Sequence, residues 1–259
     1  MRSRALLLTI PLVAALAACG SSGGSPTPPA GGAKLAGTLT VFAASSLTES
    51  FDAIGKQFEA AHPGVKVTFN YGASSMLATQ INQGAPAAVF ASAASKNMSQ
   101  VASAGNAGSP TTFAVNRMEI AVPASNPAHI TSLADLARPG VKIALCQDQV
   151  PCGATAAKVF SNAHISVKPV TQEPDVKSTL AKVIVGEVDA GVVYVTDVQA
   201  AGSKVAGITI PDAQNATTDY PIAALTHAKN AALAAAFVAY VESAAGKAVL
   251  TAAGFGSPQ

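Results

Sequence analysis

Two serine-rich segments hold the side chains that could bind an anion. Residues 43–49 read Ala-Ala-Ser-Ser-Leu-Thr-Glu, and residues 72–77 read Gly-Ala-Ser-Ser-Met-Leu. Each segment follows an expected strand and opens an expected helix, so it places hydroxyls and free backbone N–H groups at a partially positive helix N-terminus. Ser46 and Glu49 also have the spacing of a capping box, which makes ordinary helix capping the competing interpretation.

Three places in the second half of the chain have a similar character. Residues 150–154 lead into a helix after an expected strand, and so do residues 173–176, where Pro174 suits the first helical turn. Tyr194 ends another expected strand, where its hydroxyl could reach a cleft. Open α/β sheets bind ligands at the carboxyl ends of their strands, so we expect the serine-rich segments to converge on an anion site.

The chain lacks the sequence motifs of common enzymes. It has no Gly-x-Ser-x-Gly elbow, no glycine-rich phosphate loop and no cluster of carboxylates. We therefore predict a binding protein and not an enzyme, with a serine hydrolase that uses Ser46 or Ser74 as nucleophile as a remote alternative. Cys146 and Cys152 indicate a disulfide in an oxidising compartment. A metal site is the other possibility, but the four histidines are scattered and not at ligand spacing to the cysteines.

Strand and helix patterns alternate along the chain, which indicates an α/β fold with a mostly parallel sheet. Pro221 marks the last expected strand as an edge or as a crossing segment. We expect strands at 38–43, 65–69, 87–91, 119–123, 141–145, 191–195 and 220–225. We expect helices at 47–58, 77–81, 133–136, 154–163 and 176–184, and an alanine-rich pair over 233–250.

The N-terminus has the layout of a secretory signal. Arg2 and Arg4 precede an apolar run, and residues 16–19 read Leu-Ala-Ala-Cys. This predicts a signal peptide over 1–18, lipidation of Cys19 in a lipobox-like sequence, and a flexible Gly/Ser/Pro-rich tether over 19–36. A plain signal peptide with a coincidental cysteine is the alternative. Without Arg2 and Arg4 the 16 basic residues fall to 14 and equal the 14 acidic ones, which argues against a nucleic-acid partner.

These motifs together resemble the molybdate-binding lipoproteins of ABC importers (the ModA family) over the whole mature chain. The resemblance is carried by residues 41–48, 72–81 and 84–93, and later by 175–176, 191–194 and 220–221. The chain departs from the family at Ala88, where the family usually has Asp, and at Cys152, where it has a small residue.

The resemblance implies a two-lobed, type II periplasmic-binding-protein fold, in which each lobe is a mixed sheet flanked by helices and the ligand lies in the interlobe cleft. It implies one lobe from 37–118 plus 219–259 and a second lobe from 119–218. By similarity, the ligand positions are Ser46 and Ser74 (hydroxyl and N–H), Cys152 or its neighbour (N–H), Val176 (N–H) and Tyr194 (phenol).

The implied function is capture of molybdate, and of tungstate, by a monomer that needs no cofactor or metal other than this oxyanion. The protein would be lipid-anchored on the outer (periplasmic or extracellular) face of the cell membrane and would deliver the ion to an ABC permease. A site made only of donors suits a fully deprotonated dianion, because hydrogen bonds to a charged acceptor are strong. Sulfate is electronically similar but smaller, so a binding protein for another oxyanion such as sulfate is the alternative.

Overall fold

The computed structural model describes residues 35–258. The expected signal segment, the lipidation site Cys19 and nearly all of the expected tether lie outside the described residues. The described part forms one compact unit with a nine-stranded sheet in the order β2-β1-β3-β9-β4-β7-β5-β6, in which β8 pairs with β4.

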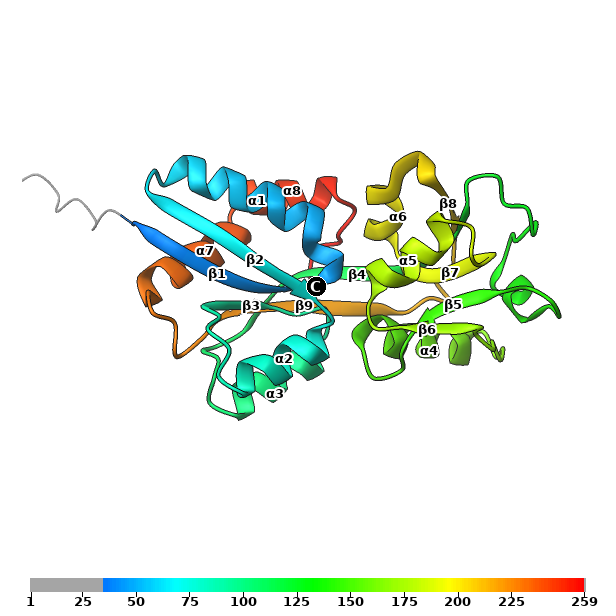
Figure 1. The fold of residues 1–259 in the computed structure, drawn as a ribbon, viewed down its shortest axis with the longest axis horizontal. Helices are drawn as coiled ribbons and strands as arrows, with labels where there is room; N and C mark the ends of the chain where they lie inside the picture. The colour runs from blue at the N-terminus through cyan, green and yellow to red at the C-terminus, as the bar shows by residue number, and fades with distance from the viewer. Residues whose placement is uncertain (1–34, 259) are drawn as a thin grey trace, which may run out of the picture. The chain divides into compact units, whose positions relative to one another are not determined.

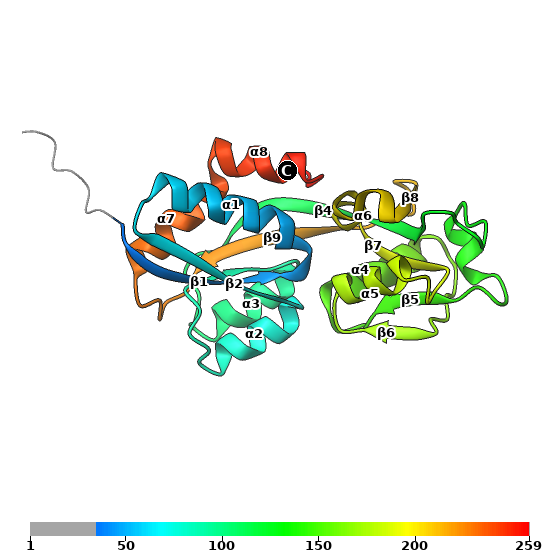
Figure 2. The same ribbon diagram turned by 45° about the horizontal axis from the view of Figure 1, so that its top comes forward.

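The first section of the sheet consists of β2, β1, β3, β9 and the first half of β4. β1 pairs in parallel with β2 and β3, whereas β9 runs antiparallel to β3 and β4. Figures 1 and 2 show α1, α7 and α8 on one face of this section and α2 and α3 on the other. The elements are β1 (Gly37–Ala44), the 3-10 turn η1 (Ser45–Leu47), α1 (Thr48–Ala61), β2 (Val65–Gly72), α2 (Ser74–Asn82), β3 (Val89–Ala91), α3 (Ser95–Ser103), β4 (Thr111–Pro123), β9 (Thr217–Ala224), α7 (Ala231–Glu242) and α8 (Ala244–Ala252).

The second section consists of the other half of β4 with the strands that follow it. β7 and β8 run antiparallel to β4, and β5 lies in parallel between β7 and β6. The elements are the 3-10 turn η2 (Leu133–Ala137), β5 (Ile143–Cys146), α4 (Pro151–Asn162), β6 (Thr171–Glu173), α5 (Val176–Ile184), β7 (Ala190–Tyr194), α6 (Val195–Ala201), the 3-10 turn η3 (Gly202–Lys204) and β8 (Val205–Thr209).

β4 belongs to both sections and carries the chain from one to the other. Residues Thr111 to Arg117 pair with β9, and Met118 to Ala121 pair with β7. The sequence pattern predicted only the second half of this strand. β9, which contains Pro221, returns the chain from the second section to the first and lies between β3 and β4. The interpretation of Pro221 as part of a crossing segment is therefore right, and its interpretation as part of an edge strand is wrong. A central strand tolerates this proline because the register with β4 shifts beside its partner Thr112.

Each section has its own hydrophobic core. One cluster surrounds Phe51, Phe58 and Phe237 and joins α1 and α7 to β1 and β9. A separate cluster joins α4 and α5 to β5 and β7 through residues such as Val159, Leu180 and Val192. Buried apolar area is the main stabilising contribution in both. Helices α1 and α7 are therefore fixed to one core and α4 and α5 to another, and α2 packs into a third, smaller cluster with Phe42 and Phe90.

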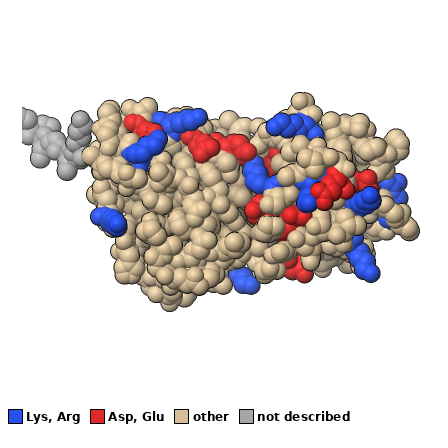
Figure 3. Space-filling model, viewed as in Figure 1, with Lys and Arg blue, Asp and Glu red and all other residues tan. Residues whose placement is uncertain are grey.

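Charges of both signs are interspersed on the face drawn in Figure 3, without a large field of one sign. Within residues 35–258, no single helix is long and apolar enough to cross a membrane. The bent pair of α7 and α8 meets such a test only together, and its axes differ by 57°.

Candidate functional site

Four helix starts meet at one small pocket. The 3-10 turn before α1, and helices α2, α4 and α5, each begin at a residue that lines it. The pocket has an empty volume of about 210 Å³. Its lining is Ala44, Ser45, Ser46, Gly72, Ala73, Ser74, Ala93, Val150, Pro151, Cys152, Asp175, Val176 and Tyr194.

All five residues predicted as ligand positions line this pocket: Ser46, Ser74, Cys152, Val176 and Tyr194. Each is less than 5% exposed. They come together because β1 and β2 of the first section run opposite to β5, β6 and β7 of the second, so the carboxyl ends of both sets of strands face the same pocket. Their role as ligands stays a prediction.

Three of the four helix starts have an apolar residue at the N-cap. Ala44, Ala73 and Val150 occupy these positions, and none of them makes a side-chain capping bond. Helices ordinarily place Ser, Thr, Asp or Asn there to accept bonds from the first-turn N–H groups. No side chain competes for those groups here, so the positive ends of these helices can interact with an anion.

The fourth helix start is capped in the ordinary way. Asp175 accepts a bond from the N–H of Ser178 at 3.0 Å, and α5 begins at Val176. Pro174 therefore precedes the cap, and the expectation that it occupies the first turn is wrong. Among the described lining residues Asp175 alone is charged, and none is a histidine. A serine nucleophile needs an adjacent general base such as a histidine, and the described lining of the pocket does not supply a histidine.

The two serine hydroxyls have different partners. Ser46 Oγ lies 2.7 Å from the hydroxyl of Tyr220. Local sequence patterns could not reveal this contact, because the two residues are 174 positions apart in the chain. The expected capping box of Ser46 and Glu49 is therefore not formed. Ser74 Oγ accepts a bond from the N–H of Ala93 at 2.9 Å. Its own hydrogen is left free to be donated.

Tyr194 presents a buried hydroxyl without a protein partner. The residue is 1% exposed and joins β7 to α6, and its hydroxyl, which lies near Thr155 and Tyr220, has no partner at hydrogen-bonding distance and angle among the described residues. Burial raises the pKa of this phenol, so it stays a neutral donor at physiological pH. A buried hydroxyl without a partner costs free energy, which a bound acceptor would recover.

A charged cluster that the sequence did not reveal lies next to the pocket. Asp197 is fully buried, and its Oδ2 accepts a bond from the N–H of Tyr194 at 3.2 Å. Burial raises the pKa of Asp197 to about 6, although Lys177, 3.3 Å away, opposes the shift. Lys177 also lies 2.8 Å from both carboxylate oxygens of Glu49.

Cys146 and Cys152 form a disulfide, with their Cα atoms 5.8 Å apart. The bond ties the end of β5 to the second residue of α4, so it fixes one helix start of the pocket. Gly153 closes the same turn tightly, because a Cβ there would lie 2.1 Å from the carbonyl oxygen of Gln147. Within residues 35–258, no group of three or more His, Cys, Asp or Glu residues could hold a metal ion.

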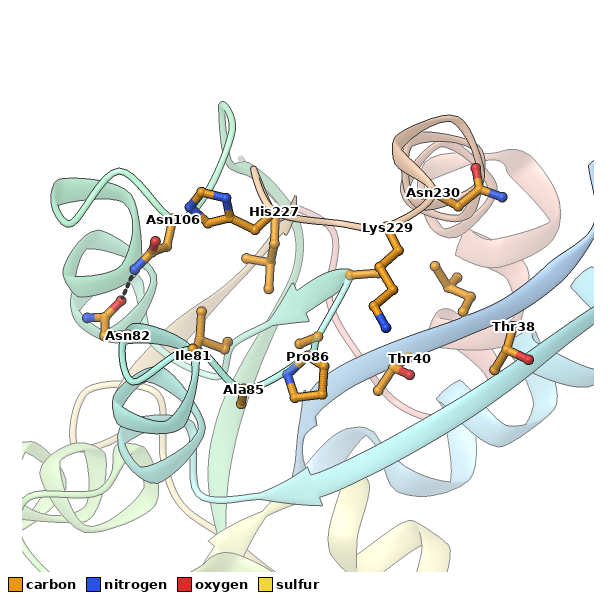
Figure 4. A pocket seen from close by; sticks show the side chains of 15 residues that line it. Thr38, Thr40, Ile81, Asn82, Ala85, Pro86, Asn106, His227, Lys229 and Asn230 are labelled. Carbon is orange, nitrogen blue, oxygen red and sulfur yellow. Dashed lines mark hydrogen bonds between the residues drawn. The ribbon is translucent and has the colours of Figure 1, made fainter.

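A larger hollow lies elsewhere, beside β1 and the end of α2 (Figure 4). Its empty volume is about 1190 Å³, and its rim carries Lys229, His227 and Asn230. It lacks the converging helix starts and the unpartnered buried hydroxyl of the smaller pocket. The chemistry of the donors, and not size, therefore selects the candidate site.

The crossing strands, the two cores and the pocket that both sections line define a two-lobed periplasmic-binding-protein fold of type II, with a mixed sheet and flanking helices in each lobe. The family model described as "Bacterial extracellular solute-binding protein" matches residues 39–256, and the chain belongs to this family. It is thus a binding protein and not an enzyme, as the sequence predicts.

Individual proteins show the same likeness. The chain is 46% identical over 253 residues to the molybdate-binding protein ModA of Mycobacterium tuberculosis, covering 97% of both chains. The periplasmic molybdate-binding protein of Azotobacter vinelandii superposes with a TM-score of 0.75 at 22% identity, covering 85% of this chain and all of the other. The sulfate-binding protein SubI of M. tuberculosis superposes at 0.76 and 19% identity, covering 84% and 86%. The last two similarities concern the fold alone, and this fold serves more than one oxyanion.

Proposed function

We propose that this protein captures molybdate, and also tungstate, in the pocket lined by both sections of the sheet and delivers it to an ABC permease. The observation that carries the proposal is the buried, unpartnered hydroxyl of Tyr194 beside three uncapped helix starts. The 46% identity to a relative named as molybdate-binding supports the choice of ion.

The donor set fits a fully deprotonated tetrahedral dianion. The hydroxyls of Ser46, Ser74 and Tyr194 and the N–H groups of Cys152 and Val176 would each donate to an oxygen of the ion. Charge-assisted bonds of this kind are about twice as strong as neutral ones. Phosphate keeps a proton near neutral pH and favours a site with a carboxylate acceptor, but none of the five proposed ligand residues is acidic, and Asp175, the only carboxylate among the described lining residues, caps α5 through the N–H of Ser178.

The ion would bind between two lobes and draw them together. We place the first lobe at 37–118 plus 219–259 and the second at 119–218. This division is supported by the change of the partner of β4 from β9 to β7 between Arg117 and Met118. A closed form favoured by the ligand is the state that a permease would recognise.

We also propose that the protein acts as a monomer, held at the outer face of the membrane by acyl chains on Cys19 after removal of residues 1–18. Labelling cells with a radioactive fatty acid tests the anchor. Label should appear on the wild-type protein and be lost in the Cys19→Ser variant. Equal labelling of both would refute lipidation at Cys19.

A melting series with molybdate, tungstate, sulfate and phosphate tests the function. An ion present at a thousand times its dissociation constant stabilises the folded state by about 4 kcal/mol. For a chain of this size this corresponds to a rise in Tm on the order of ten degrees. We expect this rise with molybdate and tungstate, and little change with phosphate. A rise with sulfate alone would support the alternative oxyanion, and no rise with any of the four would refute oxyanion binding.

A further inference from the structure

An ion pair next to the pocket joins helices that belong to different cores. Glu49 lies in the first turn of α1, which packs against β1 and β9, and Lys177 lies in the first turn of α5, which packs against β5 and β7. Figure 1 shows α1 over the left section of the sheet and α5 over the right one. The ammonium nitrogen of Lys177 lies 2.8 Å from both oxygens of Glu49.

A second carboxylate, on the side of the second section, fixes the position of the Lys177 ammonium group. Its ammonium group also lies 3.3 Å from Oδ1 of the fully buried Asp197, and its side chain is only 25% exposed. Asp197 is on α6, in the same section as α5, so this contact does not change when the two sections move apart. Glu49 is the partner that crosses between them, and it is 54% exposed.

We infer that Glu49 and Lys177 form a latch that holds the two lobes closed over the bound anion and slows its release. The inference rests on the proposed function and adds a positioning pair to it. Separating the sections breaks the contact of Lys177 with Glu49. Val176, the residue before Lys177, lines the pocket from the second section and would move away from the first section together with Lys177. Closing the lobes would therefore form the latch and the ligand cage in one motion.

A second ion pair on the same helix provides a matched control. Lys182 of α5 lies 2.8 Å from Glu187, which is 55% exposed. The lysine, the distance and the exposure of the carboxylate match those of the latch, but both partners lie in the second section and near each other in the sequence. Separating the sections leaves this pair intact.

The test compares Glu49→Gln with Glu187→Gln at low ionic strength, with molybdate as the probe. Calorimetry gives the dissociation constant, and stopped-flow displacement gives the dissociation rate. Loss of the latch should weaken binding by about two- to fivefold, the range for a partly exposed ion pair, mainly through faster release. Glu187→Gln should leave both quantities unchanged.

The direction of the effect separates the latch from plain electrostatics. Removing a carboxylate near an anion site lowers repulsion, so without a latch Glu49→Gln would bind molybdate more tightly or as before. Either of those results overturns the inference, and so does an equal loss in Glu187→Gln. In about 1 M salt, where the Debye length is about 3 Å, the difference between wild type and Glu49→Gln should shrink. A difference that does not shrink would also overturn it.

Failure of the latch and failure of the proposed function give different results. If the wild-type protein binds none of the oxyanions, the proposed function is wrong and the latch falls with it. If the wild type binds and Glu49→Gln binds equally well, only the latch is wrong. Lys177→Gln would leave the buried Asp197 without its counter-ion, so Glu49→Gln is the decisive variant.

Discussion

Replacing Tyr194 with Phe should change ligand binding and the stability of the ligand-free protein in opposite directions. The hydroxyl is buried at 1% exposure and has no partner in the described structure. Leaving such a group unpaired costs about 1–3 kcal/mol, so its removal should stabilise the ligand-free protein in the closed arrangement that the structure describes. At about 2–4 °C for each kcal/mol, Tm should rise by at least a few degrees.

The same substitution removes one donor to a charged ligand. Such a bond contributes about 1.5–3 kcal/mol, which corresponds to a loss of affinity of about tenfold to 150-fold. Calorimetric titration with molybdate measures the loss, and thermal unfolding without ligand measures the gain. Tyr240→Phe is the control, because that hydroxyl bonds to Gln57 at 3.3 Å and Tyr240 is not among the residues that line the pocket.

The reasoning would be refuted by any of three results. Unchanged affinity in Tyr194→Phe would remove the phenol from the binding site. A drop in the stability of the ligand-free variant would mean that the Tyr194 hydroxyl already has a hydrogen-bond partner without ligand. Binding of the anion would then gain no additional hydrogen bond from it. A larger affinity loss in Tyr240→Phe than in Tyr194→Phe would place the site elsewhere.

Three further outcomes follow from the surroundings of the pocket. Because the pKa of Asp197 is raised to about 6 in the folded protein, ionising it costs stability as pH rises from about 4 to 6; the Tm of Asp197→Asn minus that of wild type should increase over this range, and a flat difference would contradict the shift. Reducing the disulfide between Cys146 and Cys152 should lower the free energy of unfolding by about 2 kcal/mol for so short a loop and weaken molybdate binding, as denaturant titration and calorimetry with and without reductant will measure; unaltered binding would mean that the start of α4 needs no tie. Gly153→Ala should destabilise the protein by about 1–3 kcal/mol in urea unfolding, because its Cβ would overlap the carbonyl of Gln147, and a neutral result would show that this turn relaxes freely.

Helices with a clear apolar stripe were predictable from the sequence. The pattern of Val176, Leu180 and Val183 predicted α5 over the range that the structure gives. In contrast, α3 has few apolar residues, with Met98 and Val101 buried, and its pattern was too sparse to identify. The first half of β4 is rich in polar residues because it crosses between the sections, so only its apolar second half was predicted.

The composition of the pocket was also predictable, because ligands of α/β folds bind at the carboxyl ends of strands, and the residues after these ends line the pocket from both sections. The partners of its residues were not. Ser46 bonds to Tyr220 and Glu49 to Lys177 across 174 and 128 residues, and local spacing instead favoured a capping box between Ser46 and Glu49. Long-range pairs of this kind depend on the tertiary fold, which overrides a local preference.

The position of β9 has a consequence for how the chain reaches its native state. This strand fills the gap between β3 and β4, yet it is made more than 90 residues after β4 begins. Until it arrives, β3 and the first half of β4 present open hydrogen-bonding edges that other chains can join. The second section, whose strands β5 to β8 follow one another closely in the chain, can assemble earlier. A chain cut short before residue 217 should therefore aggregate, even though it already contains every residue that we assign to the oxyanion.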